Sequence, residues 1–248
     1  MTNTTPETDG RPTVAVFRPD DERIADAISL LDSLGVEAVP DPMLAVEPTG
    51  ERPREDGEYT ILTSKTGADL VERTGWRPGG TLCAIGESTA DALMAAGYEV
   101  DIVPEEFTSA GMVDRLEGAV DGTRVEVARS DHGSDVLLDG LEAAGAYVHE
   151  TILYRLVRPE GAGVSAERVA DGTLDGVAFT SSLTVEHFLD AASERGLEAA
   201  VRVGLDEAVV GVIGPPTRET AEAHGIPVDV VAETAAFESL ARAVVEQL

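Results

Sequence analysis

The chain has 248 residues, enough for two domains of ordinary size, and its 43% hydrophobic content supports globular packing. It carries 47 acidic against 18 basic residues, which gives a formal net charge of −29. Such acidity argues against nucleic acid and anionic membranes as partners. No run of eighteen apolar residues predicts a transmembrane helix.

The basic residues are arginines apart from Lys65, the single lysine. A dispersed acidic surface with scarce lysine is typical of cytosolic proteins from salt-accumulating halophiles, and an acidic mesophilic protein is the alternative. Residues 1–12 lack the apolar core of a signal peptide, so we expect a short disordered leader on a cytoplasmic protein. Cys83 is the single cysteine, which excludes an internal disulfide framework and a cysteine metal cluster. It lies in an apolar run and is expected in the core.

Short β-branched runs alternate with amphipathic helical stretches along the whole chain. Apolar residues such as Ile24, Ile28 and Leu31 recur at helical spacing between the runs. This alternation predicts an α/β fold built from open parallel sheets with helices on both faces. The expected strands are 13–17, 59–63, 81–85, 99–103, 124–128, 175–180, 208–213 and 228–231.

The chain repeats its own pattern. Arg18 and Arg129 each end a similar β-branched run and lie 111 positions apart, as do Met43 and Tyr154. Thr63-Ser64 recurs as Thr180-Ser181, and Ile85-Gly86 with Thr89 recurs as Ile213-Gly214 with Thr217. A duplication explains this order, and it predicts two similar flavodoxin-like lobes with a ligand cleft between them.

Two extended apolar segments interrupt the alternation at equivalent places, 37–48 and 147–159. We interpret both as inter-lobe linkers that pair as a two-stranded hinge. Each first strand–helix unit then belongs to the opposite lobe. Lobe 1 is predicted as 13–36 plus 160–248, and lobe 2 as 49–146.

The repeated polar motifs fall where ligands bind in parallel sheets, at the carboxyl ends of strands and the N-termini of helices. Their amides and hydroxyls can donate hydrogen bonds to anions, although each hydroxyl can also serve only as a helix cap. Arg18 and Arg129 can grip carboxylates or form surface ion pairs. The candidate binding residues are Arg18, Thr63, Ser64, Gly86, Thr89, Arg129, Thr180, Ser181, Ser182, Gly214 and Thr217.

Tyr154 is singular because its repeat equivalent is Met43, so one copy has gained a phenol; packing is the alternative role. The four histidines are scattered without metal-ligand spacing, and neither a metal site nor a cofactor is predicted. Nucleophile elbows, Walker loops and dinucleotide fingerprints are absent from the sequence.

These residues together resemble the uroporphyrinogen-III synthase family from Val14 to the end of the chain. The resemblance rests on Arg18-Pro19, Thr63-Ser64, Ile85-Gly86 with Thr89-Ala90, Pro104 with Phe107-Thr108, Arg129 with Gly133 and Leu137, Gly145-Ala146, Tyr154, Phe179-Thr180-Ser181, and Ile213-Gly214-Pro215 with Thr217. Phe17 departs from the family, many of whose members have a small hydroxyl residue there.

The resemblance implies cyclisation of linear hydroxymethylbilane to uroporphyrinogen III, with loss of water and inversion of ring D. It implies Tyr154 as the group that assists departure of the hydroxyl, with the binding residues holding acetate and propionate groups. It is consistent with a monomer. A two-lobed small-anion binding protein without catalysis is the alternative, and a nucleotide-sugar transferase is a weaker one.

Overall fold

The computed structural model describes residues 10–20 and 22–248, so the predicted leader falls largely outside the described residues. It divides into unit 1, Met1–Ala45 with Val157–Leu248, and unit 2, Val46–Leu156. The strands are β1 Thr13–Val16, β2 Glu37–Pro40, β3 Ala45–Pro48, β4 Tyr59–Leu62, β5 Thr81–Ala84, β6 Arg124–Ser130, β7 Tyr147–Val157, β8 Gly176–Phe179, β9 Val209–Val212 and β10 Val230–Val231.

The helices alternate with these strands. They are α1 Glu22–Ser33, α2 Lys65–Thr74, α3 Glu87–Ala95, α4 Ser109–Leu116, α5 Asp135–Ala143, α6 Val164–Ala170, α7 Ser182–Glu194, α8 Glu198–Glu207, α9 Pro215–Ala223 and α10 Phe237–Val245. None of these helices is long and apolar enough to cross a membrane.

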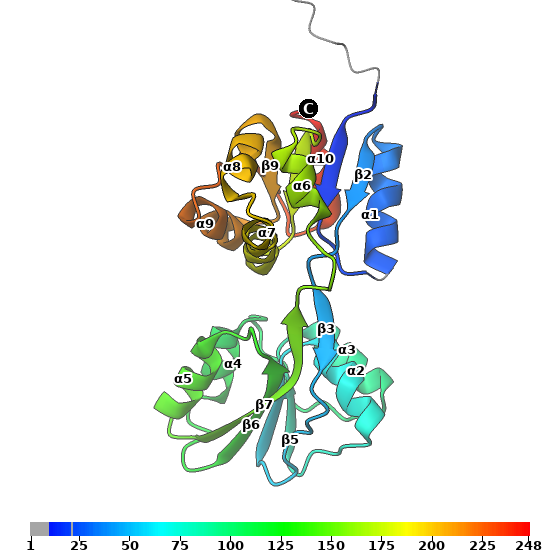
Figure 1. Ribbon diagram of the computed structural model, residues 1–248. Helices are drawn as coiled ribbons and strands as arrows, with labels where there is room; N and C mark the ends of the chain where they lie inside the picture. Colours follow the sequence, from blue (N-terminus) through cyan, green and yellow to red (C-terminus); the bar gives the residue numbers. More distant parts are fainter. Residues whose placement is uncertain (1–9, 21) are drawn as a thin grey trace, which may run out of the picture. The chain divides into compact units, whose positions relative to one another are not determined.

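Each unit contains one sheet between two layers of helices (Figure 1). In unit 1 the strand order is β10-β9-β8-β1-β2, and all four neighbouring pairs are parallel. In unit 2 the order is β3-β7-β6-β4-β5, and the pairs from β7 to β5 are parallel. The predicted α/β class with two flavodoxin-like parallel sheets is therefore confirmed.

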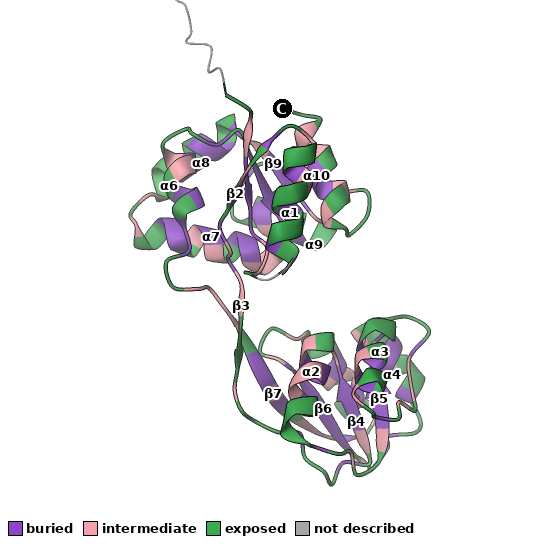
Figure 2. Ribbon diagram, turned by 90° about the vertical axis from the view of Figure 1, so that its right-hand side faces the viewer, coloured by how far each residue is buried: buried purple, intermediate pink, exposed green. Residues whose placement is uncertain are grey.

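Consecutive residues are buried along the central strands, for example all four of β8, so both faces of each sheet contribute to a core (Figure 2). In unit 1, α1 and α10 pack on one sheet face, and α6 to α9 pack on the other, where Phe17, Phe179 and Phe188 meet. In unit 2, α2 and α3 cover one face, and α4 and α5 cover the other. Each sheet is thus buried on both sides, as parallel sheets require.

The internal repeat extends to details of backbone support. Asp101 accepts a hydrogen bond from the Leu82 amide at 2.8 Å, and Asp229 accepts one from the Val210 amide at 2.7 Å. Gly97 and Gly225 both follow a helix in the left-handed region, at φ 82° and 73°. All three pairs are 128 positions apart, so the copies preserve these side-chain contacts and the turns, together with the strand order.

Four predicted ranges differ in part from the structure. The range 37–48 contains β2 and β3, and the range 147–159 is mostly β7, so strands occupy most of both predicted linkers. The chain nevertheless passes between the units inside these ranges, after Ala45 and after Leu156. An extended apolar segment is typical of a sheet strand and of a connection between units. Only the presence of a neighbouring strand to pair with distinguishes the two. The predicted strand 99–103 is reduced to a bridge between Ile102 and Cys83, and the predicted strand 228–231 to the two residues of β10.

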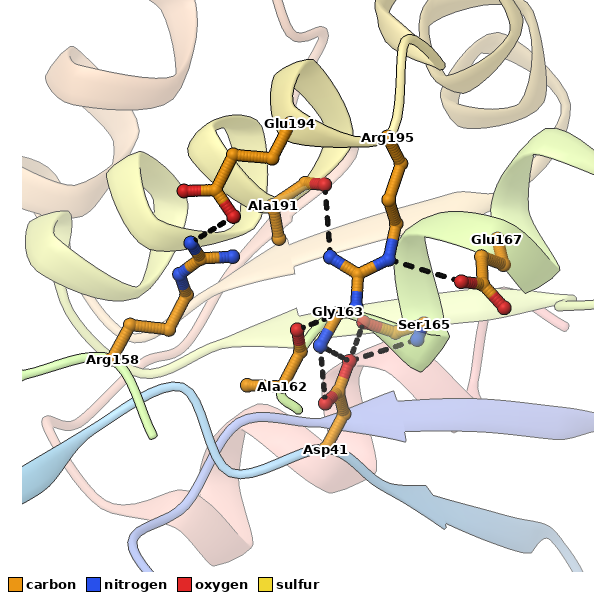
Figure 3. Close-up of polar contacts among 9 residues, drawn as sticks. All are labelled: Asp41, Arg158, Ala162, Gly163, Ser165, Glu167, Ala191, Glu194 and Arg195. Carbon is orange, nitrogen blue, oxygen red and sulfur yellow. Dashed lines mark hydrogen bonds and ion pairs between the residues drawn. The ribbon is translucent and has the colours of Figure 1, made fainter. Parts of the chain in front are cut away.

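Unit 1 holds its two chain segments together through a buried carboxylate (Figure 3). Asp41, which follows β2, accepts hydrogen bonds from the Gly163 amide at 2.9 Å, the Ser165 amide at 2.8 Å and the Ser165 hydroxyl. Arg195 donates to the Ala162 carbonyl at 2.9 Å from the other side. These contacts cap α6 and fix residues 41 and 162–165 to one another.

A second buried carboxylate lies in the central strand β6 of unit 2. Glu126 is 1% exposed, and it bonds the Nδ1 of His149 at 2.7 Å and the hydroxyl of Thr151. Both partners come from the neighbouring strand β7. Thr60 lies opposite Glu126 on β4, and its buried hydroxyl has no partner in the described part of the chain.

We expect Thr151→Val to lower the free energy of unfolding of unit 2 by about 1.5–3 kcal/mol, because a buried carboxylate loses a hydroxyl donor. Thr60→Val is the matched control: another buried threonine of the same sheet whose hydroxyl donates to nothing, so its loss should be neutral or stabilising. Urea titrations at constant salt compare them. Equal losses of unfolding free energy in the two variants would show that packing, not the hydrogen bond to Glu126, accounts for the effect of Thr151→Val.

Asp41→Asn should destabilise unit 1 by at least about 1.5 kcal/mol, because an amide nitrogen cannot accept the bonds that the second carboxylate oxygen accepts. Asp229→Asn tests the same kind of carboxylate-to-amide contact at an exposed position, and it should cost no more than about 0.5 kcal/mol. Melting curves of both variants provide the comparison, and a similar shift in the two would contradict the role of burial.

Candidate functional site

The carboxyl ends of the strands in unit 2 bring a serine and a tyrosine together. β4 ends at Leu62, and Ser64 is the N-cap of α2, where its Oγ accepts the Gly67 amide at 3.0 Å. Tyr154 belongs to β7, which reaches the same edge because β4, β6 and β7 run parallel. The Tyr154 hydroxyl donates to Ser64 Oγ at 3.0 Å.

Tyr154 combines an apolar ring with this polar end. It is 6% exposed, and its ring belongs to the cluster of Leu62, Ala68 and Ala128 under α2 and α3. Packing therefore fixes the ring, and the hydrogen bond fixes the phenol. The structure brings Ser64 and Tyr154 together, and Thr63 lies beside them on the chain.

The helices that follow β5 and β9 begin with a glycine that offers no side-chain cap. Gly86 is the N-cap of α3, and Gly214 is the N-cap of α9, both in extended backbone. Thr89 and Thr217 lie in the first turns and are buried, at 2% and 3% exposure. Neither hydroxyl has a hydrogen-bond partner among the residues that the structure describes.

These uncapped ends suit an anion, because first-turn amides carry the positive end of the helix dipole. In α9 the donors are fewer, since Pro215 and Pro216 have no amide hydrogen. The capping role that sequence reasoning left open thus applies to Ser64 and Ser181 and does not apply to Thr89 and Thr217.

At the corresponding edge of unit 1, the predicted hydroxyls make hydrogen bonds within the chain. Ser181 caps α7 in a reciprocal capping box with Thr184, whose amide donates to Ser181 Oγ at 3.2 Å. The Thr180 hydroxyl lies 3.4 Å from the Phe17 carbonyl, and the Ser182 hydroxyl donates to the Pro216 carbonyl at 3.1 Å. In unit 1 these hydroxyls therefore already have partners within the chain.

The two predicted arginines have different surroundings. Arg18 lies over the Phe237 ring, with its guanidinium carbon 5.2 Å from the ring centre. Arg129 is 5% exposed, pairs with Glu150, and donates to the Ser134 carbonyl at 2.6 Å. A substrate carboxylate would have to displace Glu150 to reach the Arg129 guanidinium.

Sequence reasoning missed three contributors to this edge. Gly67 leaves room for the cap, because an added Cβ would lie 3.2 Å from Ser64 Oγ and 3.3 Å from Leu153. Phe107 covers Gly86, where an added Cβ would lie 3.1 Å from the phenylalanine Cβ. Glu150 neutralises Arg129. The small residue at the third position after a cap was a readable signal for Gly67, whereas contacts between distant residues leave none.

Among the described residues, neither a reactive cysteine nor a group of metal-binding side chains is found. Burial first, and then Asp101, raise the pKa of the Cys83 thiol to about 12 while Arg115 opposes them, so this cysteine is no thiolate nucleophile at neutral pH. Within residues 10–20 and 22–248 no three His, Cys, Asp or Glu side chains gather to hold a metal ion.

A pocket of about 650 Å³ lies beside α3, lined by Glu87, Met94 and Phe107 among others.

Comparisons with known proteins agree with one another. A family model described as uroporphyrinogen-III synthase HemD matches residues 25–242. A protein of Methanothermobacter thermautotrophicus, named "putative uroporphyrinogen-III synthase", is 34% identical over 231 residues, covering 86% of this chain and 90% of that protein. The uroporphyrinogen-III synthase of Synechococcus elongatus is 28% identical over 67% of this chain and 66% of its own.

Two solved structures share the fold. The uroporphyrinogen-III synthetase of Helicobacter pylori has a TM-score of 0.66 at 14% identity, covering 96% of this chain and 100% of that one. A mutant uroporphyrinogen III synthase of Thermus thermophilus has a TM-score of 0.64 at 19% identity, covering 93% and 96%.

Proposed function

The chain belongs to the uroporphyrinogen-III synthase family, and on this premise we propose which of its residues perform the reaction. The enzyme cyclises hydroxymethylbilane to uroporphyrinogen III, with loss of water and inversion of ring D. The comparisons favour this activity over the alternative of a binding protein without catalysis.

Tyr154 is proposed as the group that assists departure of the terminal hydroxyl. The observation that carries this role is the position of its phenol, at the carboxyl edge of the unit 2 sheet and in hydrogen-bond contact with the cap of α2. The pyrroles supply the electron push, so the protein must mainly fold the substrate and help one hydroxyl to leave as water. A single positioned phenol suits that limited demand.

The substrate carboxylates are proposed to bind amides and hydroxyls at the helix ends. Gly86 with Thr89 and Gly214 with Thr217 are the preferred positions, because α3 and α9 have no side-chain cap to compete. Thr63, Ser64, Thr180, Ser181 and Ser182 line the neighbouring strand ends, where backbone amides are the available donors. Arg18 and Arg129 complete the set, with Arg129 acting only where a substrate group displaces Glu150.

A formal charge of −29 repels a substrate with many carboxylates. At about 1 M salt the Debye length is roughly 3 Å, so this repulsion is screened while direct hydrogen bonds remain. We therefore propose that the enzyme works in a salt-rich cytoplasm, as in halophiles, and that it acts as a monomer without nucleic acid.

Tyr154→Phe should slow formation of the type III isomer while folding stays intact. A general acid contributes about 10²- to 10⁴-fold, and we expect the low end or less because an activated hydroxymethylpyrrole leaves readily. The measurement is chromatographic separation of type I and type III products from enzymatically generated hydroxymethylbilane. Parent turnover and product ratio in this variant would make Tyr154 a packing residue.

Thr89→Ala and Thr217→Ala are the binding counterparts to that variant. Each should weaken apparent affinity by about 1 kcal/mol with turnover almost unchanged, because neighbouring amides still bind the carboxylate. A loss of turnover without a change in affinity would place these threonines in the chemical step instead.

Activity and folding should rise together as potassium chloride goes from dilute to molar concentration, because screening relieves self-repulsion among carboxylates. Melting temperature and initial rate are measured over the same salt series, with potassium glutamate as a control for anion identity. An unchanged melting temperature together with full activity in dilute buffer would refute the halophilic assignment.

A further inference from the structure

We propose that Ser64 is a positioning residue for Tyr154, and that it links the phenol to the N-terminus of α2. This inference rests on the proposed role of Tyr154 in hydroxyl departure. It concerns the Ser64 side chain, whose hydroxyl is already used within the chain, and not its amide.

The geometry around Ser64 Oγ is complete. The Tyr154 hydroxyl and the Gly67 amide both donate to this atom, each at 3.0 Å. A serine oxygen has two lone pairs, so both are occupied and the serine proton is free to point elsewhere. Three elements therefore meet at one atom: the end of β4, the first turn of α2, and β7.

The surroundings leave this arrangement little freedom. Gly67 is buried, and its missing side chain admits both Ser64 Oγ and the Leu153 methyl group. The Tyr154 ring is packed against the core of unit 2, so rotation of the phenol away from Ser64 would disturb that packing. Packing thus sets where the phenolic oxygen lies at the sheet edge, and the hydrogen bond sets the direction of its O–H group.

The second copy of the repeat lacks this link. Ser181 caps α7 in unit 1 just as Ser64 caps α2, but the repeat equivalent of Tyr154 is Met43, which has no hydroxyl. The Met43 side chain is buried and its carbonyl lies 2.6 Å from His187 Nδ1. A serine cap works without a phenol in one copy, so the phenol in the other adds a separate function.

The contact between Ser64 and Tyr154 also bears on the path of the proton that the departing hydroxyl takes up. When substrate is bound, the Tyr154 O–H turns from Ser64 Oγ to the terminal hydroxyl of the substrate. As the carbon–oxygen bond breaks, the Tyr154 proton goes to the departing oxygen, which leaves as water. The Ser64 hydroxyl then rotates to donate to the phenolate, while the Gly67 amide at the positive end of α2 still donates to Ser64 Oγ. Ring closure releases one proton from the carbon that forms the last bond, and this proton restores the phenol.

The test is a double-mutant cycle of Ser64→Ala and Tyr154→Phe, assayed on enzymatically generated hydroxymethylbilane. Ser64→Ala should lower kcat by about 3- to 10-fold, the value of one hydrogen bond, with KM changed less than about twofold. It should have no further effect in the Tyr154→Phe background, because the serine acts through the phenol. Ser64→Thr keeps the hydroxyl and should restore most of the turnover.

Thr108→Ala is the matched control for loss of a cap. Thr108 caps α4 in the same unit and accepts the Gly111 amide at 3.0 Å, again from a glycine three positions on, without a tyrosine. It should destabilise unit 2 about as much as Ser64→Ala does and leave kcat unchanged. Ser64→Gly, which removes the oxygen at little cost to an N-cap, serves if Ser64→Ala folds poorly.

The outcomes separate the two proposals. Parent turnover in Tyr154→Phe would refute the role of Tyr154 itself. Slow turnover in Tyr154→Phe with parent turnover in Ser64→Ala, or costs that add in the double variant, would overturn the positioning role alone.

Discussion

Parallel strand pairing is the constraint on which the rest of this structure depends. Because neighbouring strands run the same way, their carboxyl ends share one edge, and the helix that follows each strand starts there with unpaired amides. In both units this edge holds the repeated Thr-Ser and Ile-Gly motifs. Each copy of the repeat therefore has its own set of hydrogen-bond donors, because the parallel fold brings the first turns of its helices to one edge.

What distinguishes the four helix ends is how each is capped. A serine closes α2 and α7, so its oxygen replaces a ligand, whereas glycine begins α3 and α9 and leaves their first turns available. An anion has most to gain at the second kind of end. At a serine-capped helix end, the serine oxygen can accept a second hydrogen bond. In unit 2 the Tyr154 hydroxyl donates this bond, whereas Met43, its repeat equivalent, has no hydroxyl to donate. Both units thus have a serine cap at this position, but only in unit 2 does the serine contact a phenol.

The sequence was sufficient for the fold class, for most central strands and for the edge where these motifs gather, because strand and helix periods and the repeat can be read directly from the chain. It was insufficient for β2 and β7, since an apolar extended segment looks the same whether it pairs with a neighbouring strand, β1 or β6 here, or connects two units. The partners of Arg129 and Asp41 were hidden for another reason. Glu150 and Ser165 are distant or unremarkable in the sequence, and only packing brings their polar groups within reach.

Neutral donors at the edges also reconcile the chain's acidity with an acidic substrate. Arg129 is neutralised by Glu150, and Arg158 pairs with Glu194, whose pKa this hydrogen bond holds below its usual value. Arg129 and Arg158 are thus engaged by the protein's own carboxylates, so the groups proposed to meet a ligand are mainly amides and hydroxyls, with Arg18 as the added cation. Their hydrogen bonds act at contact distance and survive salt that screens net charge. High acidity and carboxylate recognition are compatible because they operate over different distances.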